Sequence, residues 1–316
     1  NPHIEPVSPE GRWPRGRAFP GYSQNAISRS SWDPKAPACV VCGKASHGFE
    51  DRKEAGEGGW YHLDLDAGQI TIDGYGERLI VDLGSSGGYG PWGLYRGDNY
   101  GKGTFGHNVL MIGGRNTLEL GASHPRMVAS DFDDEKGGWW KADLTGTYEG
   151  AKGIRRTVVH LNPGIVAVLD EAELEQAEEI SLRWHTVDRC EPDAHGSFTI
   201  EAGEVRCAGQ VARLDGELLS VERKEHAFEP PYDVDYYGIK RPQLYESYVE
   251  IIADDDRATF LALFCTYGPG ETAGRWSEES GVWSIGMADG QARVAVTEDS
   301  IEVKNTGTGA GWLVER

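Results

Sequence analysis

The stretch YHLDLDAGQITIDGYGERLIVDLG, from Tyr61 to Gly84, carries three side chains that can exchange protons or bind metals at every second position. These are His62, Asp64 and Asp66. Side chains alternate between the two faces of an extended chain, so an extended conformation would place all three on one face. The spacing is compatible with a metal site, a proton shuttle or a solvated sheet surface.

A β-hairpin is predicted directly after these residues. The sequence DGYG at 73–76 lies between two β-favouring runs and is typical of a hairpin turn. The apolar positions change from odd to even numbers across Gly68, which predicts a bulge or a sharp bend there. Folding about the turn brings Asp82, on the return strand, toward Asp64 and Asp66.

A glycine- and aromatic-rich loop follows the hairpin and enters the next apolar run at His107. Tyr95 and Tyr100 lie in this loop. Long loops on rigid sheets commonly carry binding and catalytic residues, so both tyrosines are candidate site residues.

The charge of the chain excludes some classes of partner. The 316 residues include 31 basic and 51 acidic side chains, which gives a net charge of −20. This charge opposes nonspecific binding to nucleic acid or to an anionic membrane surface. No apolar run of about 18 residues is present, so no membrane-spanning helix is expected. An anionic substrate would need a local basic pocket.

The five cysteines are too few and too scattered to predict a disulfide framework. The CVVC sequence has the spacing of a redox motif or half of a zinc ribbon, but no second CxxC pair completes a ribbon. We therefore expect a structural or incidental role. The cysteines are Cys39, Cys42, Cys190, Cys207 and Cys265.

Short β-favouring runs between turn signals fill the chain after about residue 59, and with 43 glycines they predict an all-β protein. Their spacing favours a β-sandwich over parallel βαβ layers. We expect residues 1–58 to form an extended lead segment that joins or packs on a helical partner domain, and residues 59–316 to form the sandwich. The one helix-like segment, Glu171 to Glu179, lacks a clean apolar face.

The order of these motifs resembles that of a known family. The series is HxDxDxG, a hairpin ending in VDLG, a tyrosine-bearing loop, and HN before an apolar strand. It resembles the C-terminal β-sandwich of the heparinase II/III-like polysaccharide lyases, which include lyases for heparan sulfate, alginate and oligoalginate. The likeness covers most of Phe19 to Asp188 and implies a large antiparallel β-sandwich. The family's N-terminal α/α toroid is absent from this chain.

The resemblance also implies roles for individual residues. The family motif is usually HxHxDxG, with its first histidine at the catalytic centre. The second histidine, the aspartate of the return strand and the histidine of HN hold a structural zinc. This implies His62 as the active-site histidine, and Asp64, Asp82 and His107 as metal ligands. Because Asp64 replaces a histidine, the harder donor set would also suit manganese, calcium or magnesium.

The resemblance implies a polysaccharide lyase that cleaves a uronic-acid-containing glycan by β-elimination. This reaction needs relief of the carboxylate charge, a base for the C5 proton and an acid for the departing O4. His62 could meet one of these needs, and Tyr95 or Tyr100 could assist.

The expected partners are an anionic polysaccharide or oligosaccharide and a helical α/α toroid domain or chain that completes the active site. The expected location is the periplasm or the extracellular space. The alternative is a noncatalytic carbohydrate-binding or scaffold sandwich, which the missing toroid and the histidine-to-aspartate change favour.

Overall fold

A computed structural model of the chain describes residues 7–19, 24–44, 64–82, 99–101, 103–118, 125–230, 233–234, 240 and 243–316. Regular structure in these residues consists of β-strands and three short 3₁₀ turns, without any α-helix. The prediction of an all-β, antiparallel fold is therefore confirmed. No helix among the described residues is long and apolar enough to cross a membrane.

Fourteen strands form one large sheet. Its main path runs β1-β2-β3-β4-β5-β10-β14-β12-β11, while β6 and β9 pair with β10, β8 with β9, β7 with β8, and β13 with β14. Neighbours are antiparallel throughout. The strands are β1 (Gly16–Phe19), β2 (Asn25–Arg29), β3 (Cys39–Lys44), β4 (Gln69–Gly74), β5 (Glu77–Ile80), β6 (Leu110–Ile112), β7 (Arg126–Asp133), β8 (Gly137–Asp143), β9 (Ala151–Leu161), β10 (Ile165–Thr186), β11 (Ser197–Ala202), β12 (Val205–Arg213), β13 (Ser220–Ala227) and β14 (Tyr245–Tyr267).

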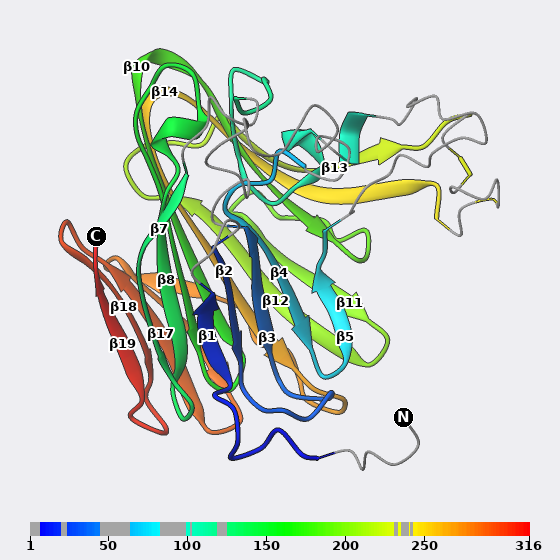
Figure 1. Cartoon of the computed structure of the whole chain (residues 1–316), viewed down its shortest axis with the longest axis vertical. Coiled ribbons are helices and arrows are strands. Elements are labelled where there is room, and N and C mark those ends of the chain that lie inside the picture. Colours follow the sequence, from blue (N-terminus) through cyan, green and yellow to red (C-terminus); the bar gives the residue numbers. More distant parts are fainter. Residues whose placement is uncertain are drawn as a thin grey trace.

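The C-terminal strands form a second, five-stranded sheet in the order β15-β16-β17-β18-β19. In Figure 1 this sheet lies at one edge of the molecule, whereas β1 to β5 cross the middle of the molecule. Its strands are β15 (Ser277–Glu279), β16 (Val282–Met287), β17 (Gly290–Val296), β18 (Ser300–Asn305) and β19 (Gly311–Glu315), and the 3₁₀ turns are η2 (Asn99–Gly101), η3 (Thr104–Gly106) and η4 (Thr145–Thr147).

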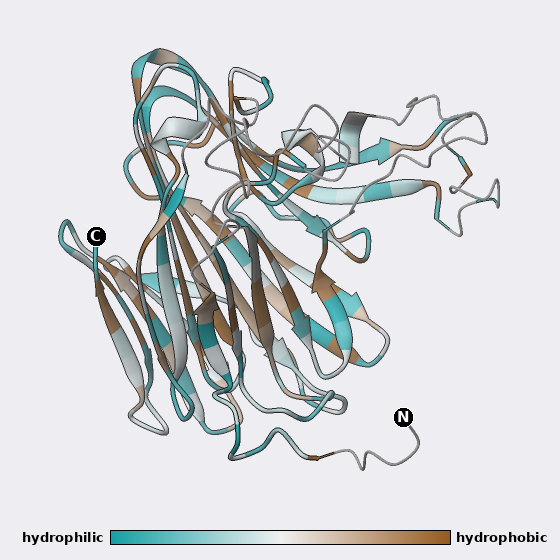
Figure 2. Cartoon of the chain, viewed as in Figure 1, coloured by the Kyte–Doolittle hydropathy of each residue, from teal (hydrophilic) through white to brown (hydrophobic). Residues whose placement is uncertain are grey.

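Strand β10 contributes to two hydrophobic cores, one on each of its faces. Val166 and Val168 pack in the core shared with β2 to β5, whereas Ile165, Ala167 and Leu169 pack in the core shared with the C-terminal sheet. Successive side chains point to opposite faces of a strand, so burial on both faces explains the continuous apolar run in this part of β10. In Figure 2, hydrophobic and hydrophilic residues instead alternate along many of the other strands.

The N-terminal residues are part of the large sheet. Strand β3 pairs with β4 through Val40 and Ile72, and both side chains are fully buried. The lead segment predicted over residues 1–58 therefore contains three strands of the sheet, because its alternating apolar residues complete the core. Its packing on a helical partner stays a prediction.

Local turn chemistry explains the predicted hairpin. Strands β4 and β5 pair through Gly74 and Glu77, and the two residues between them, Tyr75 and Gly76, have φ of 52° and 86°. Two consecutive left-handed residues are typical of the tight turns that join antiparallel strands. The hairpin at 73–76 is confirmed.

The bend at Gly68 is also confirmed. This glycine has φ of 84°, and a Cβ atom there would lie 2.8 Å from Leu144 Cδ1.

The helix-like segment from Glu171 to Glu179 is instead part of β10, with irregular pairing between Glu173 and Glu178.

A buried ion pair connects the strands to the loops of the site. Arg156 on β9 and Asp170 on β10 are both about 1% exposed, and Arg156 Nε and Nη2 donate to the two carboxylate oxygens at 2.7 and 2.9 Å. Arg156 Nη1 also donates to the carbonyl oxygens of Gly68 and Asn108. One guanidinium therefore holds two loop segments that are 40 residues apart in sequence.

Removing one member of this pair tests its importance. We expect Asp170→Ala to lower the free energy of unfolding by about 3–5 kcal/mol, because Arg156 would stay buried without its counter-charge. Glu201→Ala is the matched control: it breaks an exposed pair with Arg206 and should cost less than about 1 kcal/mol. Urea unfolding measures both, and equal losses would contradict the expectation.

Candidate functional site

Asp66, Asp82 and His107 converge at one corner of the large sheet. Asp66 precedes β4, Asp82 follows β5, and His107 follows η3. Their nearest ligand atoms all lie within 4.8 Å of one another. His107 is fully buried and Asp66 nearly so, while the side chain of Asp82 keeps 26% of its surface exposed. We call these three residues the His–Asp corner. Of their side chains, only that of Asp82 is partly exposed to solvent.

The imidazole of His107 lacks hydrogen bonds in this setting. Its Nδ1 lies 3.2 Å from Oδ1 of Asp82, but the two atoms are not aligned for a hydrogen bond. Its Nε2 likewise has no hydrogen-bond partner among the described residues. A buried polar group without a partner is costly, so ring nitrogens in this state point to a ligand that the corner binds.

The donor set fits a divalent cation. One imidazole nitrogen and two carboxylates suit zinc, and manganese accepts the same ligands. Calcium prefers a larger set of oxygens than these two aspartates offer. The corner can therefore hold one divalent ion through Asp66, Asp82 and His107.

The structure brings Asp66 into this group and leaves Asp64 outside it. Residues 64–68 form no strand, so Asp64 and Asp66 do not share one face of an extended chain as the spacing suggested, and only the resemblance had implied Asp64 as a ligand. Asp66 instead begins a turn. The backbone N–H of Gln69 closes this turn by donating a hydrogen bond to the backbone carbonyl oxygen of Asp66 at 2.9 Å. Asp64 is half-buried and near enough to act on His107 by its charge.

The pKa of His107 reflects two opposing effects. Burial lowers it, but the direct side-chain contact with the Asp82 carboxylate and the negative charges of Asp82, Asp66 and Asp64 outweigh burial, and the net result is a raised pKa. Without a metal ion, His107 is therefore stabilised in its protonated form. A metal ion would replace that proton, because only the neutral imidazole is a ligand.

Asn108, which sequence reasoning did not select, connects the corner to three parts of the sheet. Its Nδ2 donates to the carbonyl oxygens of Ile70 and Val81, both at 2.9 Å. Its Oδ1 accepts the backbone N–H of His185 at 2.6 Å, and its own N–H donates to Gln69 Oε1. The HN dipeptide thus combines a candidate ligand, His107, with the residue that fixes its position. The asparagine of this dipeptide was the only sequence feature that pointed to Asn108.

Tyr100 donates its hydroxyl proton to His185. The hydroxyl oxygen lies 2.8 Å from His185 Nε2, and His185 Nδ1 lies 3.1 Å from Asn108 Oδ1. Because the amide nitrogen of Asn108 donates to two carbonyls, its oxygen must accept from Nδ1–H, which leaves Nε2 as the acceptor. Burial, with the nearby His107 and Arg183, lowers the pKa of His185 to about 3, so this ring is neutral.

The side chain of Tyr100 is largely enclosed. Only 8% of the residue is exposed, and its ring stacks on His226 with centroids 3.7 Å apart. Burial raises the pKa of its hydroxyl, so the phenolate is disfavoured in the described structure. Two further predicted site residues, His62 and Tyr95, lie outside the described residues, and their roles stay predictions.

Comparison with known proteins identifies the architecture. A heparinase III gene product with methylated lysines is similar with a TM-score of 0.69 and 14% identity, over 96% of this chain and 42% of that one. A second heparinase III gives a TM-score of 0.66 and 15% identity, over 95% and 42%. The heparan sulfate lyase HepC from Pedobacter heparinus gives 0.65 and 15%, over 95% and 42%. The chain thus has the fold of one part of these lyases and spans less than half of their length.

The sequence gives the closer assignment. The family model described as heparinase II/III-like, C-terminal, matches residues 54–250, which is more than half of the chain. The chain belongs to this family. No curated protein matches the sequence.

The raised pKa of His107 predicts how metal-free protein responds to pH. Protonation of this ring stabilises the fold below the unfolded pKa of about 6.5, and this contribution is lost as pH rises through the higher folded pKa. In excess chelator, the free energy of unfolding of wild type minus that of His107→Gln should therefore fall as the pH rises above about 6.5. His195→Gln replaces an exposed histidine outside the corner and is the matched control. A difference that grows with pH would contradict the assignment.

Proposed function

We propose that this chain is the sandwich part of a polysaccharide lyase that cleaves a uronic-acid-containing glycan by β-elimination. Membership of the heparinase II/III-like family carries the proposal, since the matched residues 54–250 include the HxDxDxG motif and the HN dipeptide. Solved structures with this fold include proteins named heparinase III and heparan sulfate lyase.

The His–Asp corner is proposed as a structural site for one divalent ion, zinc first, held by Asp66, Asp82 and His107. The ion would supply positive charge that neutralises the two carboxylates and locks three chain segments together. This chain's own residues do the remaining positioning: Asn108 and Arg156 fix the backbone on either side of the corner.

His62 is proposed as the residue that meets the substrate. It precedes Asp66 by four residues, so an ordered corner restricts where it can lie. There it would hydrogen-bond the uronate carboxylate or relay the C5 proton, which must leave before O4 departs. Tyr95 is proposed to assist. Tyr100 would need to exchange its bond with His185 for one to the substrate.

A helical toroid is proposed as the partner that completes the active site, because the chain covers 42% of the similar lyases. The proposed location is the periplasm or the extracellular space, where a polymeric glycan is accessible. The noncatalytic alternative is supported by one observation, the enclosure of Tyr100 and the engagement of its hydroxyl by His185.

Elemental analysis tests the ion and separates the two candidate aspartates. Purified protein should contain about one divalent ion per chain, and Asp66→Ala or His107→Ala should lose it together with the stability that binding contributes. Asp64→Ala removes an equal charge from outside the group and should retain the ion. Retention by Asp66→Ala with loss by Asp64→Ala would restore the ligand set implied by the family motif.

Replacing His62 tests the chemistry. In the protein that includes the helical part, His62→Ala should lose on the order of 10² to 10⁴ in turnover, the usual cost of removing a proton-transfer group. Absorbance of the unsaturated uronate product gives the rate, and elemental analysis should show the ion retained. His195→Ala, exposed and distant in sequence, is the control. Wild-type turnover by His62→Ala would reject the catalytic role.

A further inference from the structure

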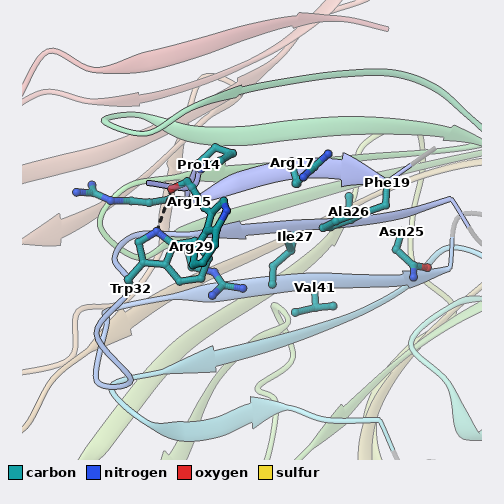
Figure 3. Close-up of a pocket in the computed structure, with 11 residues that line it drawn as sticks. Pro14, Arg15, Arg17, Phe19, Asn25, Ala26, Ile27, Arg29, Trp32 and Val41 are labelled. Carbon is teal, nitrogen blue, oxygen red and sulfur yellow. Dashed lines mark hydrogen bonds between the residues drawn. The ribbon is translucent and has the colours of Figure 1, made fainter. Parts of the chain in front are cut away.

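A hollow of about 480 Å³ lies on the outer face of β1 to β3, formed by segments away from the His–Asp corner. Ile27 and Val41 lie at its floor, and Trp13, Phe19 and Trp32 line it (Figure 3). Trp13 and Phe19 are 54% and 45% exposed, among the most exposed large apolar side chains of the described residues. Ala26 and Val40 point to the buried face of β2 and β3, which leaves Ile27 and Val41 on the outer face.

The charge of this hollow is opposite to that of the chain. Arg15, Arg17 and Arg29 line it, and no acidic residue does so, although the chain carries a net charge of −20. Arg15 is paired with Glu10 at 2.7 Å. Within the described part of the chain, Arg17 and Arg29 form no ion pair. The hollow therefore offers two guanidinium groups that form no direct ion pair with a described carboxylate.

Aromatic rings hold both of these arginines in place. The Arg17 guanidinium lies 4.8 Å from the ring centroid of Phe19, and that of Arg29 lies 4.2 Å from that of Trp32. The Trp32 indole N–H in turn donates to the Trp13 carbonyl oxygen at 3.2 Å, which fixes its ring. Nε of Arg29 is shielded from solvent and has no hydrogen-bond acceptor among the described residues.

The hollow continues at both ends. A second hollow shares Phe19 and extends along Met127 to Ser130 of β7. A third shares Arg29 and Trp32 and extends to Arg78 on β5, and its lining also includes Asp33 and Asp73, so its charge is mixed. The three form a row across the sheet face, which suits an extended ligand more than a compact one.

We propose that this row, the β1–β3 groove, binds an acidic oligosaccharide at a site separate from the elimination chemistry. Aromatic side chains combine a large apolar surface with a rigid shape, which suits the apolar face of a sugar ring. The guanidinium forks of Arg17 and Arg29 match the geometry of carboxylate or sulfate groups. The ligand class follows from the proposed function, but the groove shares none of its lining residues with the His–Asp corner.

Titration calorimetry of the 316-residue chain tests the groove without turnover. The probes are a mannuronate tetrasaccharide, a heparin-derived tetrasaccharide and neutral mannotetraose. We expect the two acidic probes to bind more tightly than the neutral one, with affinity that falls as salt is raised. If only the heparin-derived probe binds, sulfate is the recognised group; if both acidic probes bind, the carboxylate suffices.

Three variants assign the binding to the groove. Arg17→Gln combined with Arg29→Gln should weaken the acidic probes about tenfold or more, because charge-assisted contacts are lost. Trp13→Ala should weaken all probes that bind. Arg257→Gln combined with Arg206→Gln removes the same charge from exposed positions outside the groove and should bind as wild type does.

Unchanged affinity in the arginine double variant, with its melting temperature preserved, would overturn the proposal. So would the absence of binding by every probe, which would instead favour a protein domain as the occupant of this face. The binding test does not depend on turnover. Wild-type turnover by His62→Ala would reject the catalytic proposal without affecting this test, so the two proposals can fail separately.

Discussion

The buried pair of Arg156 and Asp170 is the constraint on which the site depends. These residues face each other across β9 and β10, and the guanidinium also binds the carbonyl oxygens of Gly68 and Asn108. Gly68 follows Asp66 by two positions, and Asn108 follows His107 directly. The pair therefore transmits the rigidity of two central strands to both loop segments of the His–Asp corner. Because both charges are fully desolvated, the loss of either is costly.

Asn108 applies a second constraint of a different kind. It satisfies backbone groups at the ends of β4 and β5 and on β10 that would otherwise be buried without partners. Its oxygen also sets the tautomer of His185, and through it the direction of the Tyr100 hydroxyl. The corner and the tyrosine are thus coupled through one amide, although Tyr100 is not part of the cation-binding group.

The layered arrangement separates two kinds of surface. One core packs β2 to β5 against the central strands, and the other packs the C-terminal sheet against their opposite face. Burial of the inner faces of β2 and β3 leaves the aromatic and arginine side chains of the β1–β3 groove outside. A single sheet can in this way carry an acidic corner at one place and an arginine-lined hollow at another, in a chain whose overall charge is negative.

The sequence by itself determined the features that depend on neighbouring residues. Short β-favouring runs between turn signals predicted the all-β fold, the DGYG turn predicted the hairpin, and the change of parity predicted the bend at Gly68, because each follows from local backbone geometry. The order of motifs was enough to predict the family. The same resemblance implied Asp82 and His107 as ligands, and both belong to the His–Asp corner.

Tertiary structure alone decided the contacts between residues far apart in the chain. It brought Asp66 to His107 rather than Asp64, which the resemblance had implied, since the chain turns at Asp66 instead of continuing as a strand. It placed Arg156 and Asn108 as the supports of the corner and included β1 to β3 in the large sheet. These outcomes depend on which buried polar groups find partners across strands, and no local pattern carries that information.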